Sequence, residues 1–150
     1  MTELECNAQQ HTHQFTWPVR VYYEDTDGAG VVYYANYLRY FERARTEWLR
    51  ALGFELTDLA TQYGVVFVVR AITVEYRLPA RFNDALGITV ELGDVGASQI
   101  TLKQCALLDG NRLVDAQVRL ACVNLAAMKA VRIPKPVSTK LSVKISEKTT

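Results

Sequence analysis

Two aspartates and two glycines lie close together just before the longest helical pattern of the chain: Asp25, Asp27, Gly28 and Gly30. Glycine permits positive φ angles and lets backbone N–H groups approach a ligand. The first N–H groups of a helix lack intrahelical partners and carry its positive dipole end. A carbonyl oxygen bound there would be polarised, and Asp27 would attack its carbon or activate water. These residues are typical of acyl-transfer or hydrolytic chemistry.

The same residues also fit a purely structural turn. Asp side chains often accept hydrogen bonds from backbone N–H groups two residues on, so Asp25, Thr26 or Asp27 can close a turn with the glycines. A phosphate loop is not indicated, because the Gly28-x-Gly30 pair lacks the G-x-x-x-x-G-K-[ST] and G-x-G-x-x-G spacings. The turn and the catalytic interpretation both stay open on these residues alone.

The positions of the histidines and cysteines limit which kinds of site are expected. The only histidines, His11 and His13, lie in a polar N-terminal segment, so neither a metal site nor a histidine triad is predicted. The three cysteines, Cys6, Cys105 and Cys122, are odd in number and form no C-x-x-C, which predicts reduced thiols in a cytoplasmic protein. We expect Cys105 and Cys122 to be buried, since apolar residues surround them.

Bulk composition excludes several classes of protein. The chain has 150 residues, of which 49% are hydrophobic and 22% are charged. This length and composition predict one globular domain. Seventeen basic and sixteen acidic residues leave a net charge of +1, which does not favour a nucleic-acid partner. No apolar run is long enough for a membrane span, and no signal peptide is visible.

The hydrophobic pattern predicts an α+β fold of about five antiparallel strands and one long helix. In the helix, Tyr37, Phe41, Ala44, Trp48 and Leu52 form an apolar stripe. One helix covers little of such a sheet, so dimerisation is expected. The predicted strands are 19–23, 65–78, 85–92, 98–108 and 111–125, and the predicted helices are 35–52 and 58–63. The domain is expected to span residues 15–136, between flexible tails at 1–14 and 137–150.

Two stretches resemble a known family. VRVYYEDTDGAGVVYYANYLRYFERARTEWL, residues 19–49, resembles the hotdog-fold acyl-CoA thioesterases of the 4-hydroxybenzoyl-CoA thioesterase type, and is most similar to the YbgC-like branch associated with the bacterial Tol–Pal system. FVVRAITVEYRLPARFNDAL, residues 67–86, extends the match. The resemblance implies a long helix wrapped by a curved antiparallel sheet, homodimers that share a continuous sheet, and a dimer of dimers. It implies an acyl-CoA thioesterase without a metal or bound cofactor, coenzyme A being part of the substrate.

The resemblance also assigns roles within the motif. Asp27 takes the position of the catalytic aspartate, as nucleophile or general base. The backbone N–H of Tyr34 takes the position that polarises the thioester carbonyl, and Tyr23 matches a tyrosine that lines the site. Many members of this branch have histidine at position 34, so tyrosine removes any imidazole role there but keeps the N–H. Gly30, Val31 and Tyr33 are predicted to contact substrate.

The coenzyme A nucleotide is expected near Ser98 and Lys103 and the neighbouring subunit. Glu42 is a second candidate carboxylate, because related hotdog enzymes use a glutamate on the helix, although Glu42 beside Arg43 and Arg45 also fits a structural ion pair. Two other functions stay open. One is hydration or dehydration of an acyl thioester, which usually needs a histidine that the folded part lacks. The other is binding of an acyl carrier protein or an envelope-biogenesis partner, with vestigial turnover.

Overall fold

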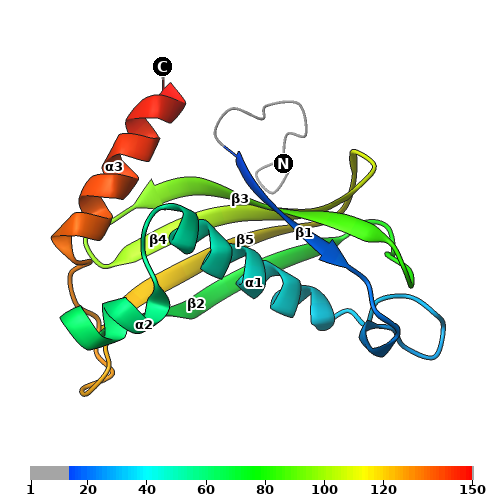
Figure 1. Cartoon of the computed structure of the whole chain (residues 1–150), viewed down its shortest axis with the longest axis horizontal. Helices are drawn as coiled ribbons and strands as arrows, with labels where there is room; N and C mark the ends of the chain where they lie inside the picture. Colours follow the sequence, from blue (N-terminus) through cyan, green and yellow to red (C-terminus); the bar gives the residue numbers. More distant parts are fainter. Residues whose placement is uncertain (1–13, 150) are drawn as a thin grey trace.

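The computed structural model describes residues 14–149, which form a five-stranded antiparallel sheet and three helices (Figure 1). The strands are β1 (Gln14–Arg20), β2 (Val65–Tyr76), β3 (Ala85–Val95), β4 (Gln99–Leu108) and β5 (Asn111–Asn124). The helices are α1 (Asn36–Ala51), α2 (Leu56–Asp58), which continues as the π-helical turn η2 (Leu59–Tyr63), and α3 (Lys135–Thr149). The predicted α+β fold is confirmed.

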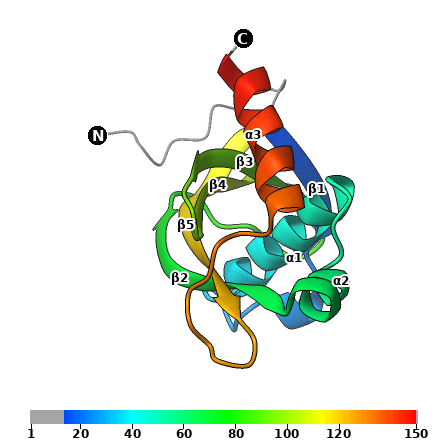
Figure 2. The same ribbon diagram turned by 90° about the vertical axis from the view of Figure 1, so that its left-hand side faces the viewer.

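The sheet has the order β1-β3-β4-β5-β2, so β1 and β2 are its edges. Seen from the end, the sheet curls around α1 (Figure 2). Pro18 sits inside β1 opposite Gly87. A proline that cannot donate to the ladder is tolerated there because β1 has a neighbour on one side only.

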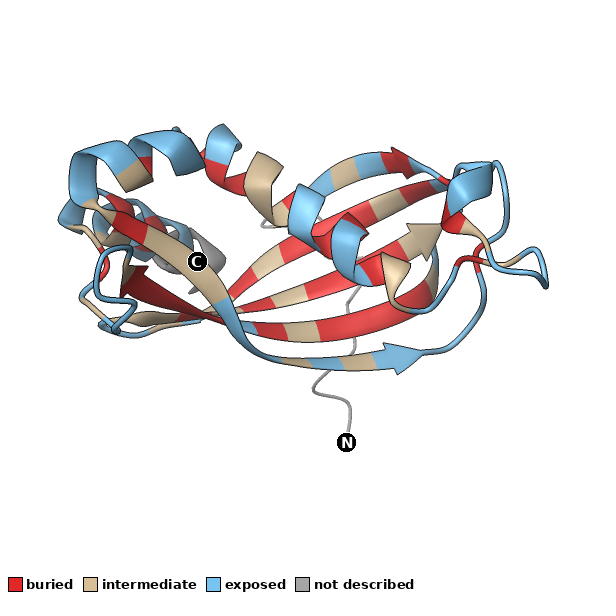
Figure 3. Ribbon diagram, turned by 90° about the horizontal axis from the view of Figure 1, so that it is seen from below, coloured by how far each residue is buried: buried red, intermediate tan, exposed pale blue. Residues whose placement is uncertain are grey.

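The core lies between α1 and the concave face of the sheet (Figure 3). Tyr37, Phe41, Ala44 and Trp48 of the predicted stripe are all buried, as the period of the helix requires. Gly53 follows α1 with a φ of 98°, the left-handed conformation that commonly ends a helix. The long helix is therefore fixed on the sheet along its length, and its N-terminus is held in one place.

Two predictions about the chain ends are revised. The predicted strand at 19–23 is shifted, because β1 is Gln14–Arg20 and residues Tyr23–Asp25 form the 3₁₀ turn η1. The predicted N-terminal tail, residues 1–14, lies outside the described residues except for Gln14. The predicted C-terminal tail, 137–150, is wrong for its described part. It forms α3, which packs Val137 and Leu141 into the core, four residues apart and therefore on one face.

Candidate active site

The loop between β1 and α1 is a small hairpin fastened to the segment around residue 80. Asp27 donates its N–H to the Val31 carbonyl (2.9 Å) and accepts the N–H of Gly30 on its own carbonyl (3.1 Å). Gly30 has a φ of 81°, which glycine adopts at little cost. Beyond the turn, the Val32 N–H donates to the Ala80 carbonyl (2.9 Å). The turn is thus held firmly against the body of the protein.

The same segment is attached to α1. The Ala80 N–H donates to the Tyr37 hydroxyl on the first turn of the helix (3.1 Å). Burial raises the pKa of Tyr37, so this phenol stays neutral at physiological pH. The hairpin and the N-terminus of α1 are therefore held in a fixed relation through one residue, Ala80.

The geometry of Asp27 fits both the turn and the catalytic interpretation of its sequence context. Its Oδ1 accepts the Ala29 N–H (2.8 Å), which is the Asx-type turn. Its side chain is nevertheless exposed, and within the described residues its Oδ2 has no hydrogen-bond partner. The turn therefore orients the carboxylate and leaves one oxygen accessible to a ligand.

Tyr34 supplies an unused backbone donor at the start of α1. Within residues 14–149, its N–H makes no hydrogen bond, whereas the N–H of Tyr33 donates to the Asp25 carbonyl (3.0 Å) and that of Asn36 to the Tyr33 carbonyl (2.8 Å). Ala35, the N-cap residue, offers no side-chain oxygen to the helix. An N–H that points from a helix N-terminus without a partner is suited to a carbonyl oxygen that gains negative charge.

The Tyr34 main chain is also held by the end of β2. The Tyr76 hydroxyl, at the end of β2, donates to the Tyr34 carbonyl (2.9 Å). The two rings also meet edge to face, with centroids 6.3 Å apart, and the Tyr76 ring contacts Tyr37 in the same way at 5.8 Å. The unused N–H thus belongs to a residue whose position is fixed by β2.

Asp25 is a buried carboxylate that the sequence does not separate from Asp27. It is 9% exposed, and its Oδ2 accepts the Tyr22 N–H (2.8 Å), which closes η1. Burial by itself would raise the pKa of Asp25, but the Tyr22 N–H, Tyr40, Asn36 and Arg43 together hold it below its usual range. In the described residues, Tyr40 Oη and Asn36 Nδ2 are buried without a hydrogen bond of normal geometry, so they act on Asp25 as nearby dipoles. Asp25 is therefore a structural anion, and Asp27 is the accessible one.

Three hollows follow one another along α1. The first, about 300 Å³, adjoins the Asp27 loop and reaches Asn36 and Arg39. The second, about 510 Å³, shares Arg39 with the first and runs past Glu42 and Thr46. The third, about 300 Å³, shares Glu42 and Thr46 with the second and lies between α1 and β2. An elongated substrate therefore has a surface path that starts at the predicted catalytic residue.

The other predicted site residues fall into two groups. Gly30, Val31 and Tyr33 lie in the Asp27 hairpin or directly after it, and Tyr33 lines its hollow. Tyr23 is 79% exposed and packs edge to face against Phe82 at 5.9 Å instead of lining that hollow. Its predicted role in the site therefore gains no support from the geometry.

Ser98 and Lys103 are not brought to Asp27 within one chain. Ser98 lies in the turn after β3, whereas the Asp27 hairpin adjoins the start of that strand (Figure 1). β3 has 11 residues, so the two ends are roughly 30 Å apart. Ser98 is therefore far from Asp27 of the same chain, and the binding of a nucleotide at Ser98 and Lys103 stays a prediction.

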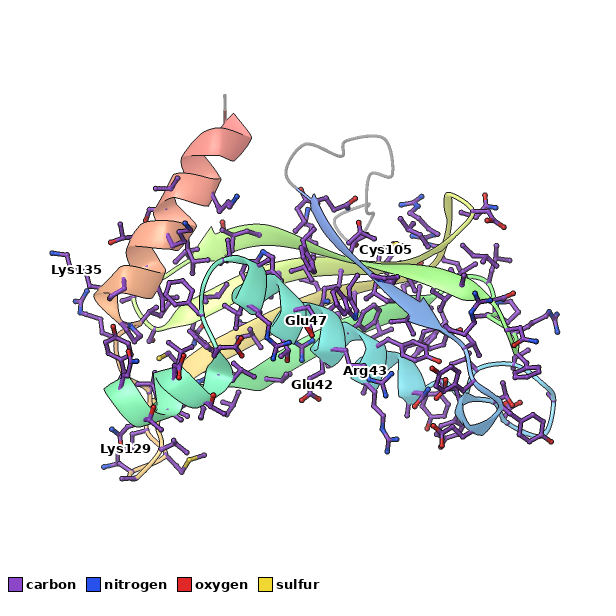
Figure 4. The ribbon with its side chains drawn as sticks, in the orientation of Figure 1. Glu42, Arg43, Glu47, Cys105, Lys129 and Lys135 are labelled. Atoms are coloured by element: carbon purple, nitrogen blue, oxygen red, sulfur yellow. The ribbon has the colours of Figure 1, made fainter. Side chains whose placement is uncertain are left out.

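Glu42 projects from α1 between the second and third hollows (Figure 4). It makes no ion pair with Arg43 or Arg45 among the described residues, so the predicted structural pair is not formed. Cys105 and Cys122 are buried free thiols, as predicted. In the part of the chain that the structure describes, no three His, Cys, Asp or Glu side chains gather as metal ligands, and no helix is long and apolar enough to cross a membrane.

Comparison with known proteins shows the family to which the chain belongs. A family model described as the thioesterase-like superfamily matches residues 21–141. The chain belongs to this superfamily. It is 44% identical over 123 residues to the acyl-CoA thioesterase YbgC of Haemophilus influenzae, covering 82% of this chain and 90% of that protein. It is also 44% identical over 128 residues to the acyl-CoA thioester hydrolase YbgC of Escherichia coli O6:H1, covering 85% and 95%.

Solved structures give the same result. A probable thioesterase from Bartonella henselae superposes with a TM-score of 0.77 at 36% identity, covering 81% of this chain and 99% of that one. A hypothetical protein from Aquifex aeolicus superposes with a TM-score of 0.79 at 29% identity, covering 85% and 98%. As a member of the thioesterase-like superfamily with the hotdog fold, the chain is a thioester hydrolase.

Proposed function

We propose that this thioester hydrolase cleaves acyl-CoA, with Asp27 and the Tyr34 N–H as its catalytic pair. The observation that carries the proposal is that one short, rigid loop offers both an accessible carboxylate oxygen and an unused N–H at a helix N-terminus. Relatives at 44% identity are named acyl-CoA thioesterases, which supports coenzyme A as the carrier.

The reaction follows from these two groups. The thioester carbonyl oxygen accepts the Tyr34 N–H, and the positive end of α1 stabilises the charge that this oxygen gains. Asp27 either attacks the carbonyl carbon, which forms a mixed anhydride that water then hydrolyses, or takes a proton from the water that attacks. In both routes the C–S bond breaks, coenzyme A leaves as a thiolate, and a free acid is released. No metal or redox cofactor is required by either route.

We further propose that the active form is a homodimer, and that dimers pair into a tetramer. β2 is an edge strand of 12 residues with Val69 and Tyr76 exposed on it, so its unpaired backbone is open to a second copy. Such pairing would bring the second chain close to the α1 surface of the first. A fully active monomer in sedimentation-velocity and activity measurements at the same concentration would contradict this arrangement.

The test is turnover of a panel of acyl-CoA esters of increasing chain length, followed by release of free thiol. We expect saturable hydrolysis of at least one member and a loss of about 10² in kcat/KM or more in Asp27→Ala, the contribution of an acid–base group. Very low kcat/KM on every ester, together with tight binding of an acyl carrier protein, would instead favour the binding function.

A further inference from the structure

Asn36, the first residue of α1, lines the same hollow of about 300 Å³ as Asp27. Asparagine is common where a helix begins, because its side chain can accept the free N–H groups of the first turn. In α1, however, no side chain makes such a bond. Within residues 14–149 no donor is bonded to Asn36 Oδ1, and Asn36 Nδ2 is buried without a hydrogen bond of normal geometry. Helix capping therefore does not account for this side chain.

The buried end of the Asn36 amide faces the structural anion Asp25. The Asp25 carboxylate is 9% exposed, and Tyr40 beside it is fully buried. Although burial would raise the pKa of Asp25, Tyr40 and Asn36 are among the groups that lower it, because their N–H and O–H groups point towards the carboxylate. A reversed amide would turn its oxygen towards this anion. The charge of Asp25 therefore fixes Asn36 with Nδ2 inward and Oδ1 outward.

The outward oxygen makes Asn36 an oriented acceptor in the Asp27 hollow. Asp27 supplies a second acceptor there, its Oδ2, because its Oδ1 is already bonded to the Ala29 N–H at 2.8 Å. Glu24 also lines the hollow, but it is exposed and no hydrogen bond holds its side chain within the described residues. The hollow thus has two fixed acceptors, one from the loop and one from the helix.

The reaction brings one molecule that can donate to both acceptors. A thioester group has no N–H or O–H, whereas the attacking water has two protons. We propose that Asn36 is a further catalytic residue, whose Oδ1 accepts a hydrogen bond from the attacking water while Asp27 takes the other proton of that water. This inference rests on the proposed function and selects its general-base route.

In this step the water oxygen bonds to the carbonyl carbon, and one water proton moves to Asp27 Oδ2. The electron pair of the carbonyl bond moves onto the oxygen that accepts the Tyr34 N–H. The C–S bond then breaks, coenzyme A leaves as a thiolate with the electron pair of that bond, and Asp27 loses its proton to solvent. Asn36 takes no proton. Its bond to the water directs the water lone pair at the carbon.

The experiment measures acyl-CoA cleavage by the full chain in water that contains methanol. Methanol has one O–H, which it gives to Asp27 when it attacks, so it has none left for Asn36. Asn36→Leu removes the acceptor and keeps the side-chain size, and Asn36→Ala is a second variant without it. Tyr40→Phe is the control, because it changes the buried side of the same amide and leaves Asn36 Oδ1 in place. Acid and methyl ester are measured by mass spectrometry.

We expect both Asn36 variants to form acid about two- to tenfold more slowly, the value of one hydrogen bond, and to raise the ratio of ester to acid by the same factor. Tyr40→Phe should keep the wild-type ratio. The same ratio in the wild type and the Asn36 variants, including no ester in any of them, would overturn the water contact. A displaced Asp27 or Tyr34 would slow both reactions equally and leave the ratio unchanged.

A single turnover in water labelled with a heavy oxygen isotope separates this inference from the proposed function. We expect the label in the released acid. Unlabelled acid would mean that Asp27 attacks the carbon itself, which overturns the role of Asn36 and leaves acyl-CoA hydrolysis by Asp27 standing. A wild-type chain that cleaves no acyl-CoA would instead overturn the proposed function.

Discussion

The contact between Tyr76 and Tyr34 makes a specific prediction about catalysis. Tyr76→Phe removes the hydroxyl that donates to the Tyr34 carbonyl at 2.9 Å and leaves the ring contacts with Tyr34 and Tyr37. The proposed oxyanion donor is the N–H of the same residue, so the variant should loosen this donor without altering the surface proposed to bind substrate. Burial raises the pKa of Tyr76, which keeps the hydroxyl protonated and able to donate throughout the neutral range.

The magnitude follows from the value of one partly exposed hydrogen bond, about 0.5–1.5 kcal/mol. If this energy acts only in the transition state, kcat should fall about two- to tenfold and KM should stay the same. The assay is steady-state hydrolysis of the best acyl-CoA substrate. Tyr63→Phe is the matched control, because Tyr63 is 42% exposed against 46% for Tyr76 and makes no side-chain hydrogen bond within the described residues.

Three results would each refute this reasoning. Wild-type kcat in Tyr76→Phe would mean that the hydroxyl does not position the donor. A rise in KM with unchanged kcat would mean that Tyr76 contributes to ground-state binding instead. An equal loss of kcat in Tyr63→Phe would point to a general effect of removing surface hydroxyls.

Three further predictions concern the loop and the C-terminus. The pKa of Asp25 is lower in the folded than in the unfolded state, so its carboxylate stabilises the fold above the unfolded pKa of about 3.9, and this stabilisation is lost as the pH falls through the lower folded value. Asp25→Asn should therefore weaken the dependence of the unfolding free energy on pH below about pH 4. An unfolding free energy with the same pH dependence as the wild type would contradict this prediction. Gly30→Ala should lower the free energy of unfolding in urea by about 1–2 kcal/mol, because Gly30 has a φ of 81° and alanine is strained there. Gly28→Ala should lower it less, because Gly28 has equal space for a methyl group but no positive φ. Equal losses in the two variants would contradict the backbone strain at Gly30. Leu141→Ala should lower stability by about 2–5 kcal/mol if α3 is docked as described, and a loss below about 0.5 kcal/mol would mean that α3 is not part of the core.

Hydrophobic periodicity predicts most of the fold because burial follows it directly. The apolar stripe of α1 allows only one face of the helix to point inward, and the alternation in β2 to β5 allows only one face of each strand to do so. The C-terminal segment is missed because only Val137 and Leu141 mark its buried face, among lysines, serines and threonines that resemble a tail. Two apolar residues at helical spacing are too weak a signal without the sheet that they pack against.

The site is predicted only in part, for a similar reason. Sequence spacing brings Asp27 and the helix N-terminus together, because they are close along the chain. It does not distinguish Asp25 from Asp27, since which carboxylate is buried depends on Tyr22 and Tyr40. It also misses Tyr76, which reaches the site through the pairing of strands far apart in the chain.

In the proposed mechanism, Asp27 acts through its carboxylate and not merely as a turn residue. Asp27→Asn keeps an oxygen for the Ala29 N–H, so the Asx turn can persist while the nucleophile or base is lost. Asp109→Asn is the control, because Asp109 lies in the β4–β5 turn with a φ of 52°, which asparagine tolerates. We predict that kcat for acyl-CoA hydrolysis falls by about 10² or more in Asp27→Asn and is unchanged in Asp109→Asn. Near-normal turnover by folded Asp27→Asn would contradict the mechanism.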